Sequence, residues 1–257
     1  MIPMRILFLL AHPDDETFGP GGTIAKYARL GHEVHLAVAT RGEAGMMGTP
    51  PLTDRDRLGE FRSAELKAAA AVLGAAKVHF LGFSDGQLAV VPREKLVESA
   101  VRVIREVCPH VLMSFGPDGV SRHTDHKVMC EVALAAYDRA GDPGWYPGHF
   151  LGGERRCWNP FKLYQFELSL ELLTAFEVPL YGVSEEKLTT IIDTSADSET
   201  KLRAFDCHRT QQKDVERIKA RPGFREFLRR ETYVLVRTRL EGLPFPESDL
   251  LAGIPKE

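Results

Sequence analysis

Apolar and polar residues alternate along the first half of the chain in a pattern that predicts its secondary structure. Short apolar runs, typical of strands, occupy Arg5–Leu10, Glu33–Ala39, Lys77–Gly82 and His110–Phe115. Longer stretches with helical spacing lie between and after them, over Glu16–Leu30, Asp54–Leu73, Arg93–Val107 and Thr124–Arg139. Strands that alternate with helices form βαβ units and a parallel sheet. The sequence therefore predicts an α/β fold, a Rossmann-like and mostly parallel sheet with helices on both faces.

The second half of the chain predicts shorter elements of the same two kinds. Strands are expected over Lys162–Glu167, Leu188–Asp193 and Thr232–Arg237, and a helix over Ser198–His208. The stretch Gly141–Pro160 is rich in glycine, proline and aromatic residues and follows neither period. We interpret it as a loop near the functional site, with a disordered connection as the alternative.

Chain length and composition favour one domain. The 257 residues are 44% hydrophobic, enough for a well-buried core, and no repeat or long linker divides them. We expect a single domain over residues 1–257, in which 1–140 form the Rossmann-like core and 141–257 extend it with short strands and helices.

Charge and cysteine content narrow the classes of partner. The net charge of −3 provides no basic surface for nucleic acid or an anionic membrane, so a small-molecule substrate is expected. No apolar stretch approaches the roughly 20 residues that span a bilayer, and a cytoplasmic location follows by default. The four cysteines show no CxxC spacing and are expected to be buried, reduced thiols rather than disulfides or zinc ligands.

Polar residues of the types that bind metals or transfer protons follow each of the first four predicted strands. The carboxyl ends of parallel strands lie at one edge of the sheet, where ligands bind. The residues at these ends are His12, Asp14 and Asp15 after the first strand, Thr40, Arg41, Gly42 and Glu43 after the second, Ser84 and Asp85 after the third, and Asp118, His123, Asp125 and His126 after the fourth.

Two pairs of these residues have the same three-residue offset. His12 and Asp15 can face one point from a strand-to-helix turn while Asp14, between them, points elsewhere. In the second pair, His123 and His126, one imidazole can bind a metal and the other lie nearby. Three ligands with an open position for water are typical of catalytic zinc, although this ligand set also suits iron(II).

Each motif has a simpler explanation when taken alone. An acidic pair after a strand usually caps a helix, and single histidines usually lie on the surface or in the core. Arg62 and Glu65 could form a plain surface ion pair. Gly19-Pro20-Gly21-Gly22 lacks the spacing of a phosphate-binding loop, so close backbone packing is the better interpretation. The coincidence of both motifs at one edge favours a metal site.

The two motifs together resemble a known family. Ala11-His12-Pro13-Asp14-Asp15-Glu16, followed much later by His123-Thr124-Asp125-His126, is similar to the LmbE/PIG-L zinc deacetylases. The resemblance spans about residues 5 to 211. Further matching segments are Thr40–Gly45, Arg62–Glu65 with Leu73-Gly74, Leu81–Gly86 and His208–Gln211.

The resemblance implies a hydrolase that removes the acetyl group from an N-acetylglucosamine-type amide, which is not a peptide bond. It implies that His12, Asp15 and His126 hold one zinc ion per chain and that Asp14 is the general base toward the zinc-bound water. A divalent ion such as iron(II) stays an alternative. Members of the family often assemble as trimers or hexamers, and nothing in the sequence decides this point.

The resemblance also assigns roles to residues around the metal ligands. His123 would stabilise the tetrahedral intermediate or protonate the leaving amine, and Asp125 would orient its ring. Arg62 and Asp85 fall where family members contact the sugar. Ser121 departs from relatives that have a tyrosine at this place, so a tyrosine contact to the oxyanion is not expected.

Two other functions remain open at this point. One is an amidase of larger amino-sugar or thiol conjugates, because the metal ligands do not encode the acyl group. The other is a non-catalytic module that binds a sugar or nucleotide, with a structural metal or none. The carboxylate of Asp14 distinguishes a hydrolase from such a module, because a structural metal site does not need a carboxylate that binds no metal.

Overall fold

A seven-stranded sheet organises the computed structural model, which describes residues 2–151, 153 and 155–255. Its spatial order is β3-β2-β1-β4-β5-β7-β6. The strands are β1 (Arg5–Leu10), β2 (Glu33–Val38), β3 (Lys77–Phe80), β4 (Val111–Phe115), β5 (Lys162–Phe166), β6 (Thr190–Asp193) and β7 (Arg230–Thr238). The first five are parallel, and β7 runs antiparallel to both neighbours. The predicted mostly parallel α/β sheet is confirmed.

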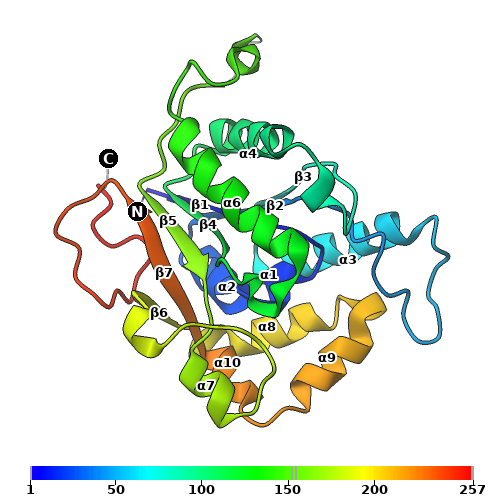
Figure 1. The fold of residues 1–257 in the computed structure, drawn as a ribbon. Coiled ribbons are helices and arrows are strands. Elements are labelled where there is room, and N and C mark those ends of the chain that lie inside the picture. Colours follow the sequence, from blue (N-terminus) through cyan, green and yellow to red (C-terminus); the bar gives the residue numbers. More distant parts are fainter. Residues whose placement is uncertain (1, 152, 154, 256–257) are drawn as a thin grey trace.

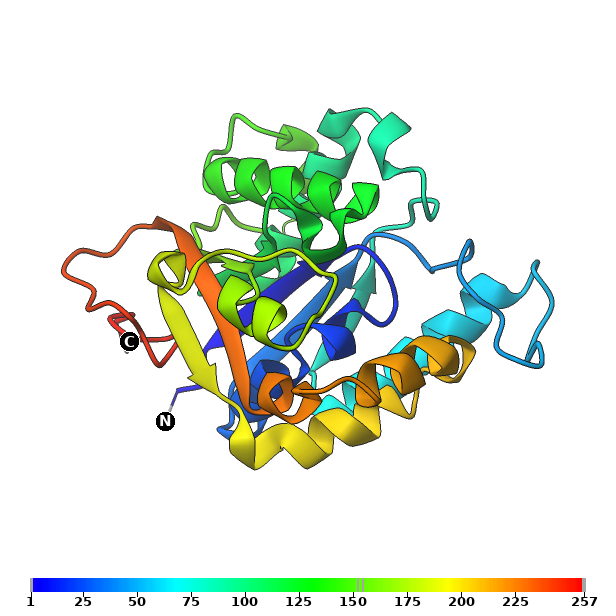
Figure 2. The same cartoon turned by 60° about the horizontal axis from the view of Figure 1, so that its bottom comes forward.

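Helices cover both faces of this sheet, as the sequence predicts (Figure 1). α4 (Arg93–Val107) and α6 (Thr124–Arg139) pack together over β1 and β4. α2 (Gly21–Arg29), α3 (Leu58–Leu73) and α8 (Ser198–Phe205) form the opposite layer, and Figure 2 shows the sheet between the two layers. Because both faces are covered, β4 is buried along its whole length.

The predicted first helix is interrupted at Gly19-Pro20. The chain forms α1 (Asp15–Phe18) and then α2, where a single helix over Glu16–Leu30 was expected. The Glu231 carboxylate accepts the first amides of α2, from Gly22 and Thr23, at 2.8 Å each. A Cβ atom on Gly22 would lie 2.7 Å from the Thr194 Cβ atom. These glycines therefore serve close packing, which confirms the sequence interpretation.

The segment Gly141–Pro160 does not lie near the functional site, so that prediction is wrong. Its described residues follow the C-terminal end of α6, which points away from the carboxyl edge of the sheet, and they project from the top of Figure 1. Arg105 at the end of α4 donates to the carbonyls of Ala140 (3.1 Å) and Asp142 (2.8 Å). The segment therefore packs against the amino edge of the sheet.

Several short helices on either side of β5 in the chain were not predicted from the sequence. Those of four to eight residues are α5 (Gly119–Arg122), α7 (Leu170–Ala175), α9 (Gln212–Lys219) and α10 (Phe224–Arg229). Phe205, Val215 and Leu228 of three helices in this half make a small second apolar cluster. None of the described helices combines the length and apolar character needed to cross a membrane.

The cysteines have no disulfide partner in the described structure. Cys108 and Cys130 are buried, as predicted, whereas Cys157 and Cys207 are half-buried. The predicted burial is therefore confirmed for two of the four cysteines, and the other two are less buried than predicted.

Candidate active site

The carboxyl edge of the sheet brings together the two motifs that lie more than a hundred residues apart in the chain. His12 follows β1 directly, and Asp15 opens α1. His126 lies in the first turn of α6, which starts at the same edge after β4. Parallel pairing of β1 with β4 is what places both strand exits side by side.

Three side-chain atoms of these residues converge on one point. The His126 Nε2 atom lies 3.2 Å from His12 Nδ1 and 3.1 Å from Asp15 Oδ1. The Asp15 Oδ2 atom lies 3.7 Å from His12 Nδ1. Ligand atoms about 3.4 Å apart surround a tetrahedral zinc ion whose bonds are about 2.0–2.1 Å long. The spacing of these donors therefore fits an ion of that size.

The outer nitrogens of both histidines are engaged by acceptors. His126 Nδ1 donates to the Gly119 carbonyl at 3.0 Å. His12 Nε2 donates to Asp125 Oδ2 at 3.2 Å and to Asp85 Oδ1 at 3.1 Å. Both rings then present an unprotonated nitrogen to the shared point, which is the usual arrangement of metal-binding histidines.

Two overlapping sets of residues could hold a metal ion by proximity. One is His12, His123 and His126, and the other is His12, Asp85 and Asp125. Neither set contains Asp15. The first shares His12 and His126 with the point described above, where the third close donor is the Asp15 carboxylate rather than His123. The second set lies on the far side of the His12 ring, where a carboxylate orients a ligand. We therefore place the candidate ion on the Nδ1 side of His12.

The carboxylate of Asp125 contacts His12 rather than His123, so the expected orientation of the His123 ring by Asp125 does not involve this carboxylate and stays a prediction. Its fully buried carboxylate also accepts the backbone amides of Gly86 (2.8 Å) and Leu88 (3.2 Å). These bonds hold the carboxylate behind His12. The ring of His123 is held instead by the backbone amide of Asp125, which donates to its Nδ1 at 3.2 Å.

The charges at the site favour a bound cation. Burial alone lowers the pKa of His12, but hydrogen bonds with Asp125 and Asp85 raise it to about 10. Burial alone raises the pKa of Asp15, yet His126 and His12 hold it well below its ordinary value. The acidic groups around the rings thus stabilise positive charge, which a divalent ion provides as well as a proton does.

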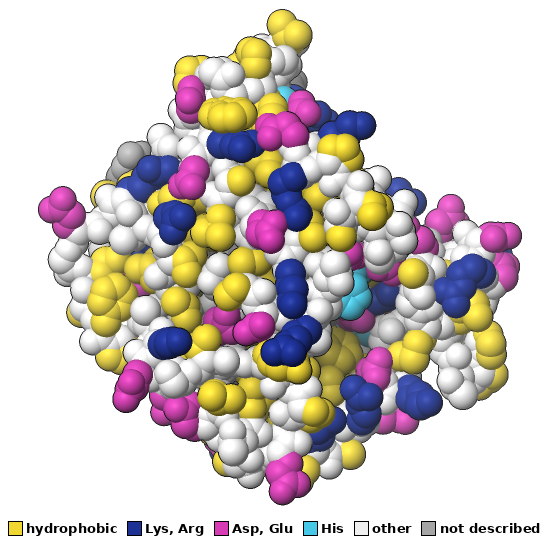
Figure 3. Space-filling model, viewed as in Figure 1, with side chains coloured by type: hydrophobic (Ala, Val, Ile, Leu, Met, Phe, Trp, Pro, Cys, Tyr) yellow, Lys and Arg dark blue, Asp and Glu magenta, His cyan; other side chains and the backbone are white. Residues whose placement is uncertain are grey.

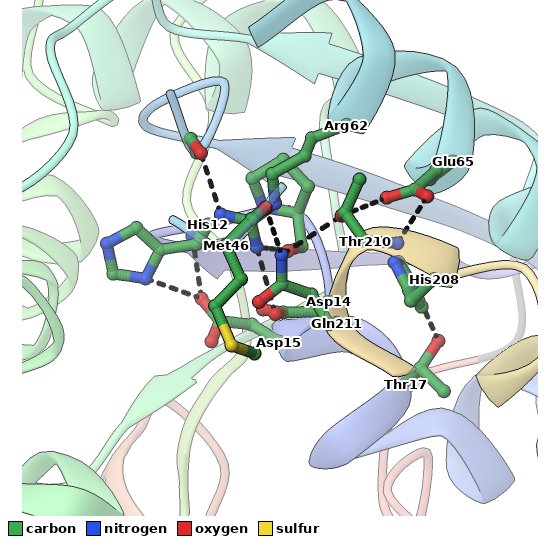
Figure 4. A network of polar contacts seen from close by, with 12 residues as sticks. His12, Asp14, Asp15, Thr17, Met46, Arg62, Glu65, His208, Thr210 and Gln211 are labelled. Carbon is green, nitrogen blue, oxygen red and sulfur yellow. Dashed lines mark hydrogen bonds and ion pairs between the residues drawn. The ribbon is translucent and has the colours of Figure 1, made fainter. Parts of the chain in front are cut away.

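Asp14 stands beside this point with its carboxylate toward the cavity. Its Oδ2 atom accepts from Arg62 Nη2 at 2.9 Å (Figure 4). Burial raises the pKa of Asp14 to about 6, although the Arg62 guanidinium opposes this. A carboxylate with a pKa near neutrality, close to bound water, has the properties of a general base.

Arg62 and Asp85, the predicted sugar contacts, both form hydrogen bonds with other groups of the protein. Arg62 is 3% exposed and donates to the carbonyls of Pro13 (2.5 Å) and Gly42 (2.8 Å) as well as to Asp14. Asp85 accepts the Ala44 amide at 3.0 Å besides its contact to His12. Both residues line the cavity, so contact with a substrate stays a prediction.

His123 caps the start of α6 at the cavity wall. Because its Nδ1 accepts the Asp125 amide, the neutral ring carries its proton on Nε2. Burial, together with His12 and His126, lowers the pKa of His123 and favours this neutral form. Its ring centroid lies 4.6 Å from that of His12, which is close enough to serve the same reacting group.

The cavity beside these residues has a volume of 540 Å³. Figure 3 shows a hollow with a histidine at its rim and an apolar floor. Most of the lining residues lie before position 127, but part of the wall comes from the second half of the chain, where no site residue was predicted. These wall residues include Phe166, Leu168, Leu180, Gln211, Asp214, Arg217 and Ile218. Apart from Gln211, which ends the matching segment His208–Gln211, no motif marks them, because a shaped wall requires no particular residue types.

Comparison with known proteins decides the family. The profile of the PIG-L family, described as GlcNAc-PI de-N-acetylase, matches residues 7–137. A relative from Thermomonospora curvata, named 1D-myo-inositol 2-acetamido-2-deoxy-alpha-D-glucopyranoside deacetylase, is 35% identical over 80% of each chain. The chain belongs to the PIG-L family.

Solved structures show how this PIG-L fold recurs. The N,N'-diacetylchitobiose deacetylase from Pyrococcus horikoshii has a TM-score of 0.69 and 21% identity, covering 90% of this chain and 83% of that one. A 4-carboxy-2-hydroxymuconate hydratase, GalB of Pseudomonas putida, has a TM-score of 0.65 and 22% identity, covering 94% and 100%. The PIG-L fold is therefore shared by proteins of different named activity, and the site has to identify the chemistry.

Proposed function

We propose that this PIG-L family member is a zinc-dependent hydrolase that removes the acetyl group from an N-acetylglucosamine-type substrate. The family and its named relatives support deacetylation of an amino sugar. The observation that carries the assignment is the placement of the Asp14 carboxylate in the same cavity as three converging donors, of which it is not one. A binding module with a structural metal has no use for such a group.

His12, Asp15 and His126 would hold the ion, one per chain. When bound, zinc lowers the pKa of water to about 7 and polarises a carbonyl group. Iron(II) is compatible with the same donors, and metal analysis of the purified protein separates the two. Asp125 and Asp85 would hold the His12 ring in the orientation that binding requires.

The remaining residues account for the proton transfers. Asp14 accepts a proton from the attacking water, whose oxygen forms the new bond to the amide carbon. The His123 Nε2–H group faces the developing negative charge on the carbonyl oxygen and stabilises it. The C–N bond then breaks, the amine nitrogen takes the proton that Asp14 accepted, delivered by Asp14 or through His123, and acetate leaves.

The relatives' names point to the substrate class. N-acetylglucosamine joined to inositol is the first compound to test, followed by diacetylchitobiose and free N-acetylglucosamine. A larger amino-sugar or thiol conjugate is the alternative, because the wall after β5 rather than the metal ligands selects the substrate. We also propose that residues 1–257 act as one domain, and light scattering would test assembly into trimers or hexamers.

Two substitutions test the proposed chemistry. Asp14→Asn removes the base but no metal ligand, so it should retain zinc and lose turnover by a factor of about 10²–10⁴. His12→Ala should lose both. Metal analysis and release of free amine from N-acetylglucosaminyl inositol measure these outcomes. Turnover of the Asp14 variant at the wild-type rate would refute the assignment of the base.

A further inference from the structure

Asp14 holds a backbone conformation that side chains other than glycine rarely adopt. Its φ is 116° and its ψ is −27°. Such a conformation is strained and persists only where surrounding groups enforce it. Its carbonyl accepts the amides of Thr17 and Phe18 at 2.9 Å each, so this residue starts α1. The question is which groups keep its peptide in place.

Arg62 holds the carboxylate of Asp14, and Glu16 holds its backbone. The Glu16 Oε2 atom accepts the Asp14 amide at 3.0 Å. Glu16 is fully buried, and its other oxygen, Oε1, lies 2.7 Å from His208 Nε2 and 2.5 Å from Thr17 Oγ1. The Glu16 carboxylate thus connects the backbone of Asp14 to the imidazole of His208, which lies far away in the sequence.

His208 supplies the charge that keeps Glu16 in this buried position. Its side chain is fully buried, and its Nδ1 has no hydrogen-bond partner among the described residues. Burial alone lowers the pKa of His208, but the adjacent Glu16 raises it above the ordinary value. Figure 4 shows His208 against Thr17, on the side of Asp14 away from His12 and Asp15. The imidazole contacts neither the metal ligands nor the cavity.

The segment that carries His208 is fixed independently of Asp14. Glu65 of α3 accepts both the backbone amide and the hydroxyl of Thr210, at 2.8 Å and 2.6 Å. Gln211 donates to the Met46 carbonyl at 3.1 Å. The residues around His208 are therefore anchored to α3 and to the loop after β2, so His208 can act as a fixed support.

We infer that Glu16 and His208 are positioning residues for the general base, holding the Asp14 peptide in its strained conformation so that the carboxylate faces the cavity. This inference rests on the proposed function, in which Asp14 is the base. It assigns a role in catalysis to the buried Glu16–His208 ion pair, although neither residue touches the substrate.

Conservative and truncating variants test the contact itself. His208→Ala should lower kcat about 10- to 100-fold, since small displacements of a reacting group cost factors of this size. KM and zinc content should not change. His208→Gln, whose amide can still donate to Glu16, should retain more activity, and Glu16→Gln should likewise exceed Glu16→Ala. Loss of zinc, or a rise of KM with kcat unchanged, would overturn the inference.

A double-mutant cycle separates positioning from mere stability. In the Asp14→Asn background, His208→Ala should cost no further turnover, because the residue to be positioned is already absent. An equal factor in both backgrounds would overturn the inference and leave the proposed function intact. Full activity of Asp14→Asn alone would instead refute the base, so the two failures differ.

Thr210→Val provides the matched control. It removes a contact of the same segment with Glu65 but none with Glu16. It should lower the melting temperature but lower kcat far less than His208→Ala does, because the Thr210 amide still donates to Glu65 and the Glu16–His208 contact is kept. Circular dichroism of each variant confirms that turnover is measured on folded protein. If Thr210→Val lowers kcat as much as His208→Ala does, the effect is structural and the inference fails.

Discussion

The acidic side chains around His12 have different tasks because their hydrogen-bond partners differ. Asp15 accepts the amides of Ala11 and His12, which leaves its Oδ1 directed to His126. Asp125 is fixed behind the His12 ring. Asp14 alone has an arginine at its carboxylate and a cavity before it. These contacts are what suit Asp15 to the proposed role of metal ligand, Asp125 to that of support for His12, and Asp14 to that of base.

Arg62→Lys tests the function of the arginine at the base. Lysine keeps the charge but cannot reach Asp14, Pro13 and Gly42 at once, because it lacks the planar fork. We expect kcat to fall about 10- to 100-fold with KM and zinc content unchanged. Steady-state kinetics measure this split. If KM rises while kcat is kept, Arg62 binds the sugar, as the family resemblance implies.

Glu167 makes the stability of the protein dependent on pH. Its side chain is 3% exposed, and burial together with Asp118 raises its pKa from 4.5 to about 7. The folded state therefore holds a proton that the unfolded chain has released above pH 4.5. Stability from this group is present below pH 4.5 and is lost as pH rises toward 7, by about 3 kcal/mol in all.

Glu167→Gln should remove this pH dependence, because glutamine stays neutral. Urea unfolding at pH 5 and pH 8 would show the variant to be more stable than the wild type at pH 8 and similar to it at pH 5. An equal difference between the two proteins at both pH values would contradict the raised pKa.

At the scale of elements, the sequence predicts which residues follow the carboxyl ends of the strands. It does not predict contacts between side chains that lie far apart in the chain. β1, α4 and α6 have the predicted bounds, and they bring His12 and His126 together. The placement of His208 beside Glu16 was not predictable, because the histidine lies after a helix in a stretch whose packing has no periodic signal. The position of Gly141–Pro160 was predicted wrongly, because composition does not show toward which edge of the sheet a loop lies.

Gly22→Ala tests the close approach of α2 to the segment after β6. The new methyl group would lie 2.7 Å from Thr194 Cβ and 3.0 Å from Glu231 Oε1, so the helix must shift. We expect a loss of about 1–3 kcal/mol in unfolding free energy. Gly148→Ala is the matched control, because no atom lies within 4 Å of its added Cβ. Equal stability of both variants in urea would contradict the packing argument.

At the scale of the molecule, the C-terminal tail is part of the core. Glu247 forms an ion pair with Lys162 of β5, both side chains being fully buried, and it also accepts from Tyr164 Oη at 2.6 Å. One apolar cluster contains both Met4 and Ile254. The sequence resemblance ended near residue 211 and left this tail unassigned, because a single buried ion pair leaves no pattern in the sequence.

Glu247→Ala should therefore destabilise the whole fold. It leaves the Lys162 ammonium buried without its partner, which costs about 3–5 kcal/mol. The double variant Lys162→Met with Glu247→Leu removes both charges and should recover most of this loss. Thermal unfolding compares the three proteins. A single variant as stable as the wild type would show that the tail is not integral to the core.

The division of the cavity between the two halves of the chain has an evolutionary consequence. The groups proposed for catalysis lie between positions 12 and 126, whereas a separate part of the cavity wall lies between positions 166 and 218. Descendants of one ancestor can therefore acquire new preferences by altering a single contiguous stretch. A chimaera that takes this stretch from a relative should inherit its selectivity while retaining the original reaction.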